Sequence, residues 1–240
     1  MTAHQIKQEL FALADEQKRE FLPYFFKTGE GQYGYGDKFI GVVVPKQRAL
    51  VKQYKTLELT EIETLLNDEY HECRLTALLF LVEKFKQAKK DIAQQKTIYD
   101  FYISQYQRIN NWDLVDLSAP YIVGEFLLNE PANELLQYAK SDNLWLQRIS
   151  ILATATFIRK NRFDKTFEIS KILLNHPHDL IHKAVGWMLR EVGKKDYNAE
   201  YQFLTEDNRY QKMPRTMLRY AIEKFPENIR QDFLKSKIKL

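Results

Sequence analysis

Apolar side chains recur every three or four positions along most of this 240-residue chain, which is the spacing of amphipathic helices. The stretch from Glu69 to Lys86 follows it throughout. Thr60 followed by Glu63 has capping-box spacing and predicts a helix over about residues 61–67. The run at residues 42–44 is strand-like but too short to build a sheet. Four prolines stand where a helix would take its first turn: Pro45, Pro131, Pro214 and Pro226. The pattern predicts an all-α chain of about a dozen helices.

Glycine is unevenly distributed and predicts one long loop. Five of the eight glycines lie between residues 29 and 41, so we expect a loop over about residues 28–40. Elsewhere the turns between helical segments are short and no low-complexity linker is present. We therefore expect a single domain over residues 1–240.

Four helical segments share a basic residue followed by an apolar stripe, at Arg74, Arg148, Lys183 and Arg219. The gaps are 74, 35 and 36 residues, so the period is near 36 with the first gap about two periods long. Such a period fits a helical-repeat solenoid, and the absence of the tetratricopeptide signature favours a HEAT-like, single curved domain. The recurring cations would form a positive stripe along the groove, suited to a long polyanion. The alternative, that they simply face water, remains open.

Composition and charge narrow the class of protein. Hydrophobic residues at 45% and charged residues at 28% are typical of a soluble globular protein. Cys73 is the single cysteine, which excludes an intrachain disulfide and favours a reducing compartment. Neither a membrane-spanning run nor a signal peptide is evident, so we expect a cytoplasmic protein. The net charge is +4, and the second half carries 20 basic against 15 acidic residues, which is weak evidence for a polyanionic partner.

The segment from Asn111 to Asp116 offers the first candidate chemistry. Trp112 and Asp116 are four residues apart and would share one face of a helix. Asp113 points elsewhere and suits the first helical turn. A carboxylate beside an indole presents negative charge and a π face to a cationic group. A structural tryptophan with a surface aspartate is the alternative.

A second candidate lies between residues 183 and 194. Lys183, Trp187, Arg190 and Lys194 follow helical spacing on one face, and three of the four are basic. This combination is typical of a nucleic-acid-binding surface, although an ordinary amphipathic face stays possible. Gly186 lowers helix stability by about 1 kcal/mol relative to Ala, which is tolerable if a neighbour or ligand needs the space.

Metal and phosphate-loop chemistry is not indicated. His176 and His178 flank a proline, but no complete ligand set accompanies them. The glycine-rich stretch lacks the Gly-Lys-Ser/Thr that a phosphate loop requires. We therefore expect neither a metal site nor a cofactor.

The chain resembles the AlkD-type DNA alkylation repair glycosylases, a HEAT-like-repeat family. The similarity lies in five segments, at residues 38–46, 111–116, 144–148, 181–191 and 214–221. It implies excision of N3- or N7-alkylated purines such as 3-methyladenine and 7-methylguanine. By match, the residues at the lesion are Asp116, Trp112 and Arg148, and the DNA contacts include Trp187 and Arg190. The repeat cations Lys183, Lys194, Arg215 and Arg219 would hold phosphates.

The resemblance also implies a mechanism and a partner. The alkylated base is thought to stay in the duplex rather than being flipped into a pocket, which predicts tolerance of bulky adducts. The partner is double-stranded DNA containing alkylated bases, with no membrane, no obligate protein partner and a monomer as the default. The loop at 28–40 departs from the family, and Tyr24, Phe25 and Phe26 are all candidates for its N-terminal aromatic contact.

Two other function classes stay open. One is a HEAT-like protein that binds damaged or branched DNA without excision, and the other is a protein-binding scaffold. The pairing of Trp112 with Asp116 argues against the scaffold, because a peptide-binding solenoid does not require it. Steep weakening of binding between about 50 and 200 mM salt would distinguish DNA binding from it.

Overall fold

A computed structural model describes residues 1–238 of the chain, and over this range the secondary structure is helical, with no β-strand. The all-α prediction is therefore confirmed. The chain divides into two compact units, which meet in sequence between Ile122 and Val123. The expectation of a single domain stays a prediction. Among the same residues, no helix is long and apolar enough to cross a membrane.

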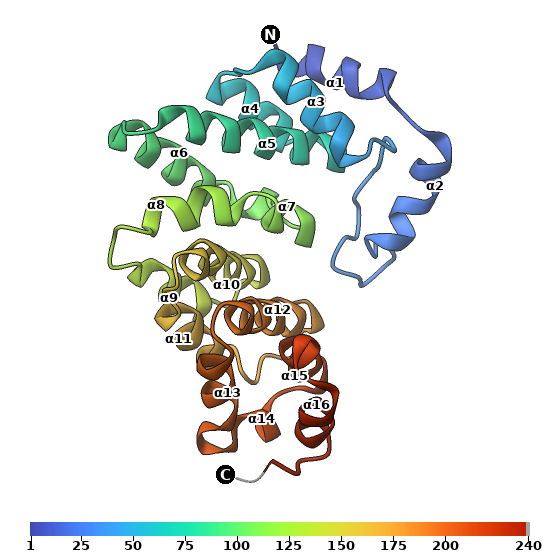
Figure 1. Cartoon of the computed structure of the whole chain (residues 1–240). Helices are drawn as coiled ribbons and strands as arrows, with labels where there is room; N and C mark the ends of the chain where they lie inside the picture. The colour runs from blue at the N-terminus through green and yellow to red at the C-terminus, as the bar shows by residue number, and fades with distance from the viewer. Residues whose placement is uncertain (239–240) are drawn as a thin grey trace. The chain divides into compact units, whose positions relative to one another are not determined.

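The first unit contains seven α-helices, named from the N-terminus. They are α1 (Ala3–Ala12), α2 (Glu16–Phe25), α3 (Val44–Tyr54), α4 (Leu59–Leu66), α5 (His71–Ala88), α6 (Ile92–Ser104) and α7 (Trp112–Asp116), with a 3-10 turn at Tyr106–Arg108 before α7. Helix α5 is the centre of this unit, because α1, α3, α4, α6 and α7 all pack against it (Figure 1). Its side chains are buried on almost every face, which explains why its apolar pattern extends beyond a single stripe.

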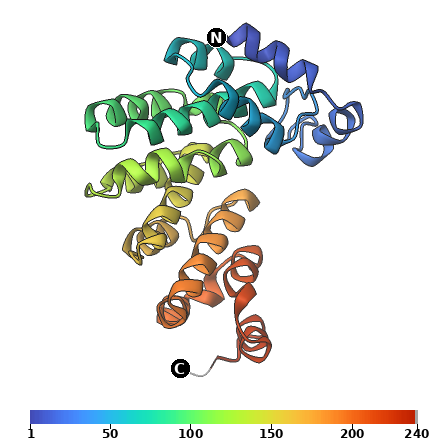
Figure 2. The same ribbon diagram turned by 45° about the horizontal axis from the view of Figure 1, so that its top comes forward.

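A long irregular segment connects α2 to α3, as the glycine pattern predicts (Figure 2). Its backbone pairs once with the start of α5, where His71 donates its N–H to the carbonyl of Lys38 at 2.8 Å. Gly41 has a φ of +95°, and a Cβ there would lie 2.1 Å from the carbonyl oxygen of Asp15. Only glycine fits this close approach, so Gly41 lets the segment lie against the start of α2.

In the second unit, helices that are close in sequence pack against one another. Its helices are α8 (Glu125–Leu127), α9 (Asn133–Ala139), α10 (Leu144–Arg159), α11 (Asp164–Ile172), α12 (Asp179–Lys195), α13 (Tyr197–Thr205), α14 (Arg209–Lys212), α15 (Arg215–Ala221) and α16 (Glu227–Leu234). Helix α10 packs on α9, α11 and α12, and α12 packs on α13 and α15 (Figure 1). This succession is consistent with a helical-repeat solenoid.

Gly186 lies where α12 meets α15. A Cβ at this position would be 2.4 Å from the carbonyl oxygen of Met217 and 2.5 Å from Cβ of Tyr220. The helix-weakening cost of glycine is therefore offset by close packing of two helices. From the sequence, the space beside Gly186 could serve either a neighbouring helix or a ligand. In the structure it is occupied by helix α15.

Several helix starts differ from their predicted positions. Helix α4 begins at Leu59 with Glu58 as its N-cap, so Thr60 lies inside the helix and the predicted capping box is wrong. Helix α5 begins at His71, after Tyr70 pairs with the irregular segment. Pro45 occupies the first turn of α3, whereas Pro214 and Pro226 are the N-caps of their helices. Each difference is one or two residues, which is the usual variation at a helix boundary.

Candidate functional site

Helix α7 carries the first candidate pair and is a single turn long. Trp112 is its first residue and Asp116 its last, and both side chains are half-buried. Asn111 caps the helix, because its side-chain oxygen accepts a hydrogen bond from the backbone N–H of Trp112 at 2.8 Å. A helix this short has little stability of its own, so its position depends on the contacts around it.

A buried ionic network holds the start of α7 against α5 and the irregular segment. The two ring nitrogens of His71 lie 3.2 Å from Asp37 Oδ2 and 2.9 Å from Asp113 Oδ2. Arg74 donates from Nη2 to the other oxygen of Asp37 at 2.6 Å, and Asn111 donates to Asp37 at 3.3 Å. His71, Arg74, Asp37 and Asp113 are each less than a tenth exposed at the side chain. The network therefore ties three segments together beside Trp112.

The charges in this network support one another. Burial opposes the charge on His71, but the carboxylates of Asp113 and Asp37 outweigh it and raise the His71 pKa to about 9. Burial would also raise the pKa of Asp37, but the hydrogen bond from His71 and the charge of Arg74 lower it. At neutral pH the histidine is thus a cation between two carboxylates, and both ring nitrogens donate hydrogen bonds.

Aromatic rings surround Trp112 on the side of α2. Phe26 stacks on it with ring centroids 5.2 Å apart, and Phe25 meets it edge to face at 5.7 Å. Phe25 is 49% exposed, and its neighbours Phe21 and Tyr24 on α2 are also exposed. Of the three candidates for the N-terminal aromatic contact, the structure brings Phe25 and Phe26 to the indole.

The second candidate face, on α12, is lined with ion pairs. Lys183 pairs with Asp179 at 2.6 Å, and Lys194 pairs with Glu191 at 2.7 Å. The other two members of the face also find acidic partners. Trp187 donates from its indole nitrogen to Glu191 at 3.1 Å, and Arg190 pairs with Glu223. Lys183, Trp187 and Arg190 are half-buried and Lys194 is exposed, and the positive charge of this face is compensated within the second unit.

The remaining predicted cations differ widely in exposure. Arg148 is only 4% exposed and donates to the carbonyl oxygen of Leu180 at 2.6 Å. Arg74 belongs to the buried network described above, so the repeated basic residues do not all face solvent. Arg215 and Arg219 on α15 are exposed, and Arg215 donates to the carbonyl of Leu234. A basic residue at a repeated position can therefore satisfy buried carbonyls as well as face water.

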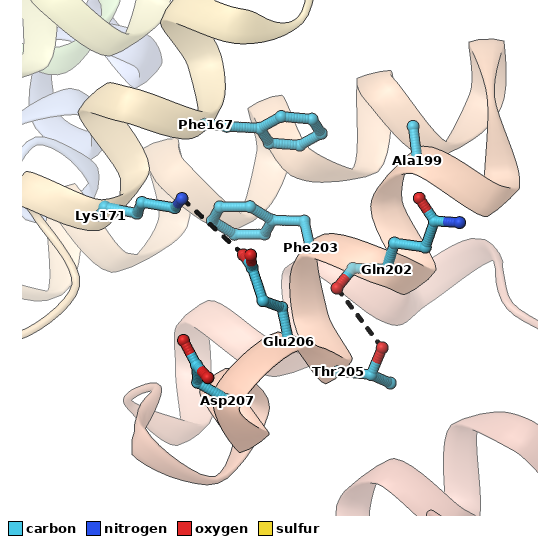
Figure 3. Close-up of a pocket in the computed structure, with 8 residues that line it drawn as sticks. All are labelled: Phe167, Lys171, Ala199, Gln202, Phe203, Thr205, Glu206 and Asp207. Atoms are coloured by element: carbon cyan, nitrogen blue, oxygen red, sulfur yellow. Dashed lines mark hydrogen bonds and ion pairs between the residues drawn. The ribbon is translucent and has the colours of Figure 1, made fainter. Parts of the chain in front are cut away.

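A separate hollow of about 580 Å³ opens between α11 and α13 in the second unit (Figure 3). The rings of Phe167 and Phe203 stack in its wall at 4.6 Å, and Lys171 reaches Glu206 at 3.7 Å. It contains none of the predicted site residues. Its one lysine already has an acidic partner, so it offers little for a phosphate to bind.

His176 and His178, next to the start of α12, are engaged in hydrogen bonds. His178 is the N-cap of the helix and accepts the backbone N–H of Leu180, while His176 lies 2.8 Å from the side-chain oxygen of Gln147. Over residues 1–238 no group of three potential ligands is close enough to hold a metal ion.

Sequence reasoning missed the acidic partners on both candidate faces. Asp37 and His71 are separated from Asp113 by 76 and 42 residues, so no local pattern links them. On α12 the signal was present, because Asp179 precedes Lys183 by four residues and Glu191 precedes Lys194 by three. These are the spacings at which helical side chains form ion pairs.

Comparison with known proteins identifies what this chain is similar to. A family model described as "DNA alkylation repair enzyme" matches residues 6–225. Among solved structures, a predicted DNA alkylation repair enzyme from Enterococcus faecalis shares 16% sequence identity, with a TM-score of 0.70. The match covers 89% of this chain and 97% of that one. At this identity the likeness shows a common fold. No curated protein matches this chain.

Proposed function

Since this chain belongs to the DNA alkylation repair enzyme family, we propose that it is a DNA glycosylase that excises positively charged N3- and N7-alkylated purines from duplex DNA. The reaction is hydrolysis of the N-glycosidic bond, so water adds to the sugar and the alkylated base leaves. The chemistry requires no lysine nucleophile, and we propose a monofunctional N-glycosyl hydrolase of base excision repair.

The chemistry of the substrate explains why few catalytic groups are needed. A purine alkylated at N3 or N7 carries a positive charge and is already a good leaving group. Cleavage leaves an oxocarbenium-like sugar, so the enzyme must stabilise cationic charge. We assign this role to Asp116, whose carboxylate can act electrostatically and can position the attacking water. Trp112 offers its π face to the same cationic centre.

The observation that carries this proposal is the placement of Trp112 and Asp116. They occupy the two ends of one helical turn, so they share a face, and both side chains are partly exposed. The buried network of Asp37, His71 and Asp113 holds that turn in place through hydrogen bonds. A catalytic pair held by a rigid, buried support is the arrangement expected for electrostatic catalysis.

We assign DNA binding to the second unit. Trp187 would contact deoxyribose, and Lys183, Arg190, Lys194, Arg215 and Arg219 would contact phosphates. By the same resemblance Arg148 is the third residue proposed for the lesion, although its side chain is buried in the second unit, where it donates to the carbonyl of Leu180. The damaged base would remain in the duplex, so bulky adducts would be tolerated. The protein would act in the cytoplasm as a monomer.

The proposal is tested by release of 7-methylguanine from methylated duplex DNA. We expect the purified protein to release the base and Asp116→Asn to lower the rate at least tenfold. Removal of a single electrostatic group from other enzymes lowers the rate by about 10²–10³. Asp100→Asn is the matched control, because Asp100 is an exposed carboxylate on α6 that pairs with Lys96. An unchanged rate in Asp116→Asn would refute the assignment of the catalytic residue.

The alternative function is a DNA-binding protein without excision activity. The half-buried pair of Trp112 and Asp116 on α7 favours it over a protein-binding scaffold, which does not require such a pair. Tight binding to duplex or branched DNA without base release would support this alternative. Binding that does not change between about 50 and 200 mM salt would exclude DNA as the partner.

A further inference from the structure

A hollow of about 390 Å³ lies between α3 and α5 in the first unit and contains none of the residues assigned above. The two helices pack against each other (Figure 1). The buried part of its wall is apolar and consists of Val51, Leu79 and Val82. The exposed part is basic, with Arg48, Lys52 and Lys55 on α3 and Lys86 on α5. This basic hollow therefore combines an apolar floor with a positively charged rim.

The positive charge of the basic hollow is not compensated by nearby carboxylates. Glu83 is the one acidic residue in its wall, and it accepts a hydrogen bond from the neutral side chain of Gln87 at 3.3 Å. Within residues 1–238, none of the four cations has a carboxylate at ion-pair distance. Lys86 lies 5.5 Å from the centre of the Tyr121 ring, which leaves its charge in place. On α12, by contrast, the lysines are paired with acids.

The cations of α3 are arranged in a row. Arg48, Lys52 and Lys55 are spaced by four and three residues, so they lie along one face of the helix. At about 1.5 Å per residue the row is about 10 Å long. A DNA strand carries one phosphate per about 3.4 Å of the duplex axis, so the row can reach about three successive phosphates. Cations spread in this way suit a chain of phosphates better than a single free anion.

The basic hollow opens on the same face of α5 as the catalytic turn. Trp112 shares the lining of a neighbouring hollow with Glu72 and Leu75 of α5. The spacing along α5 is three or four residues throughout, which places one line of side chains on one face: Glu72, Leu75, Leu79, Val82 and Lys86. A backbone that passes Trp112 can therefore continue along this face into the basic hollow.

We propose that the basic hollow binds the sugar-phosphate backbone of duplex DNA, so that the first unit holds the substrate as well as cleaving it. The four cations contact phosphates, and the apolar floor contacts deoxyribose. This inference rests on the proposed function, because it takes duplex DNA as the partner, and it adds contacts to those assigned to the second unit. Since these contacts read no base edge, they are independent of sequence.

The test measures how the affinity for a labelled, undamaged duplex depends on salt, by fluorescence anisotropy of the full-length protein between about 50 and 200 mM salt. Each lost phosphate contact lowers the slope of log Kd against log salt by about one, so we expect the double variant Arg48→Gln with Lys52→Gln to lower it by about two. Lys140→Gln with Lys160→Gln is the matched control, because these lysines are exposed at the ends of α9 and α10 and carry the same charge. Equal slopes for the two double variants would overturn the proposal.

Two further measurements separate this inference from its alternatives. Poly-glutamate that displaces the duplex as readily as unlabelled duplex does would show binding of any polyanion and overturn the assignment to DNA. Release of 7-methylguanine is measured on the same proteins. A lower slope in the Arg48 and Lys52 variant without base release by the wild-type protein would refute the proposed glycosylase alone, whereas base release with equal slopes would refute this DNA contact alone.

Discussion

His71 makes folding stability depend on pH in a window where few other side chains titrate. Its pKa lies at about 9 in the folded protein, against 6.5 for an ordinary histidine. Protonation is therefore favoured in the folded state. The protonated His71 side chain contributes its full stabilisation below about pH 6.5, and this contribution is lost as the pH rises through about 9. The difference between the two pKa values corresponds to about 3 kcal/mol of unfolding free energy.

The perturbation that isolates this contribution is His71→Gln. Glutamine keeps hydrogen-bonding capacity toward Asp37 and Asp113 but does not titrate. We expect the stability advantage of the wild-type protein over the variant to shrink by about 3 kcal/mol between pH 6 and pH 10.

The measurement is urea unfolding of both proteins, followed by far-UV circular dichroism, across this pH range. Other titrating groups, including the buried Glu200, are common to both proteins and cancel in the difference. A difference in unfolding free energy that stays constant from pH 6 to pH 10 would refute the account of the network as a charged histidine between two carboxylates.

Two further substitutions test the packing of the second unit. Gly186→Ala should lower the unfolding free energy by at least about 2 kcal/mol, because the new Cβ meets the backbone of α15. In the control Gly29→Ala the new Cβ meets only the flexible Gln32 side chain, so the unfolding free energy should change by no more than about 0.5 kcal/mol. Equal melting temperatures for the two variants would contradict this expectation. Glu200 is buried against Gly193, and burial raises its pKa from 4.5 to about 9, so the wild-type protein should lose stability as pH rises through that interval. Glu200→Gln should remove this loss, as measured by urea midpoints at pH 5 and pH 9; an equal fall in both proteins would show that the carboxyl ionises freely in the folded state.

The helical class and the long loop could be predicted from the sequence because they depend on local pattern. Apolar spacing identifies helices, and the clustered glycines around Gly34 and Gly41 identify the loop. The pair of Trp112 and Asp116 was placed on one helix for the same reason. Each of these inferences needs only a few consecutive residues.

The support of the site could not be predicted, because it is built from distant residues. No local pattern links His71 to its partners Asp37 and Asp113, which lie 34 and 42 residues away along the chain. Arg148 likewise reads as a surface cation, and only the packing of α10 on α12 shows that it reaches the carbonyl of Leu180. Tertiary contacts decide which basic residues are buried, and the local periodicity of the sequence carries no information about those contacts.

The carboxylates that neutralise the α12 face have a consequence for how this protein would search a genome. A phosphate that binds Lys183 or Lys194 competes with the carboxylate of Asp179 or Glu191 for the same ammonium group. The net attraction to an undamaged stretch is then smaller than the number of cations would imply. For the proposed glycosylase this predicts a short residence time on ordinary sequence, so that the protein would sample many positions before it stops at a lesion.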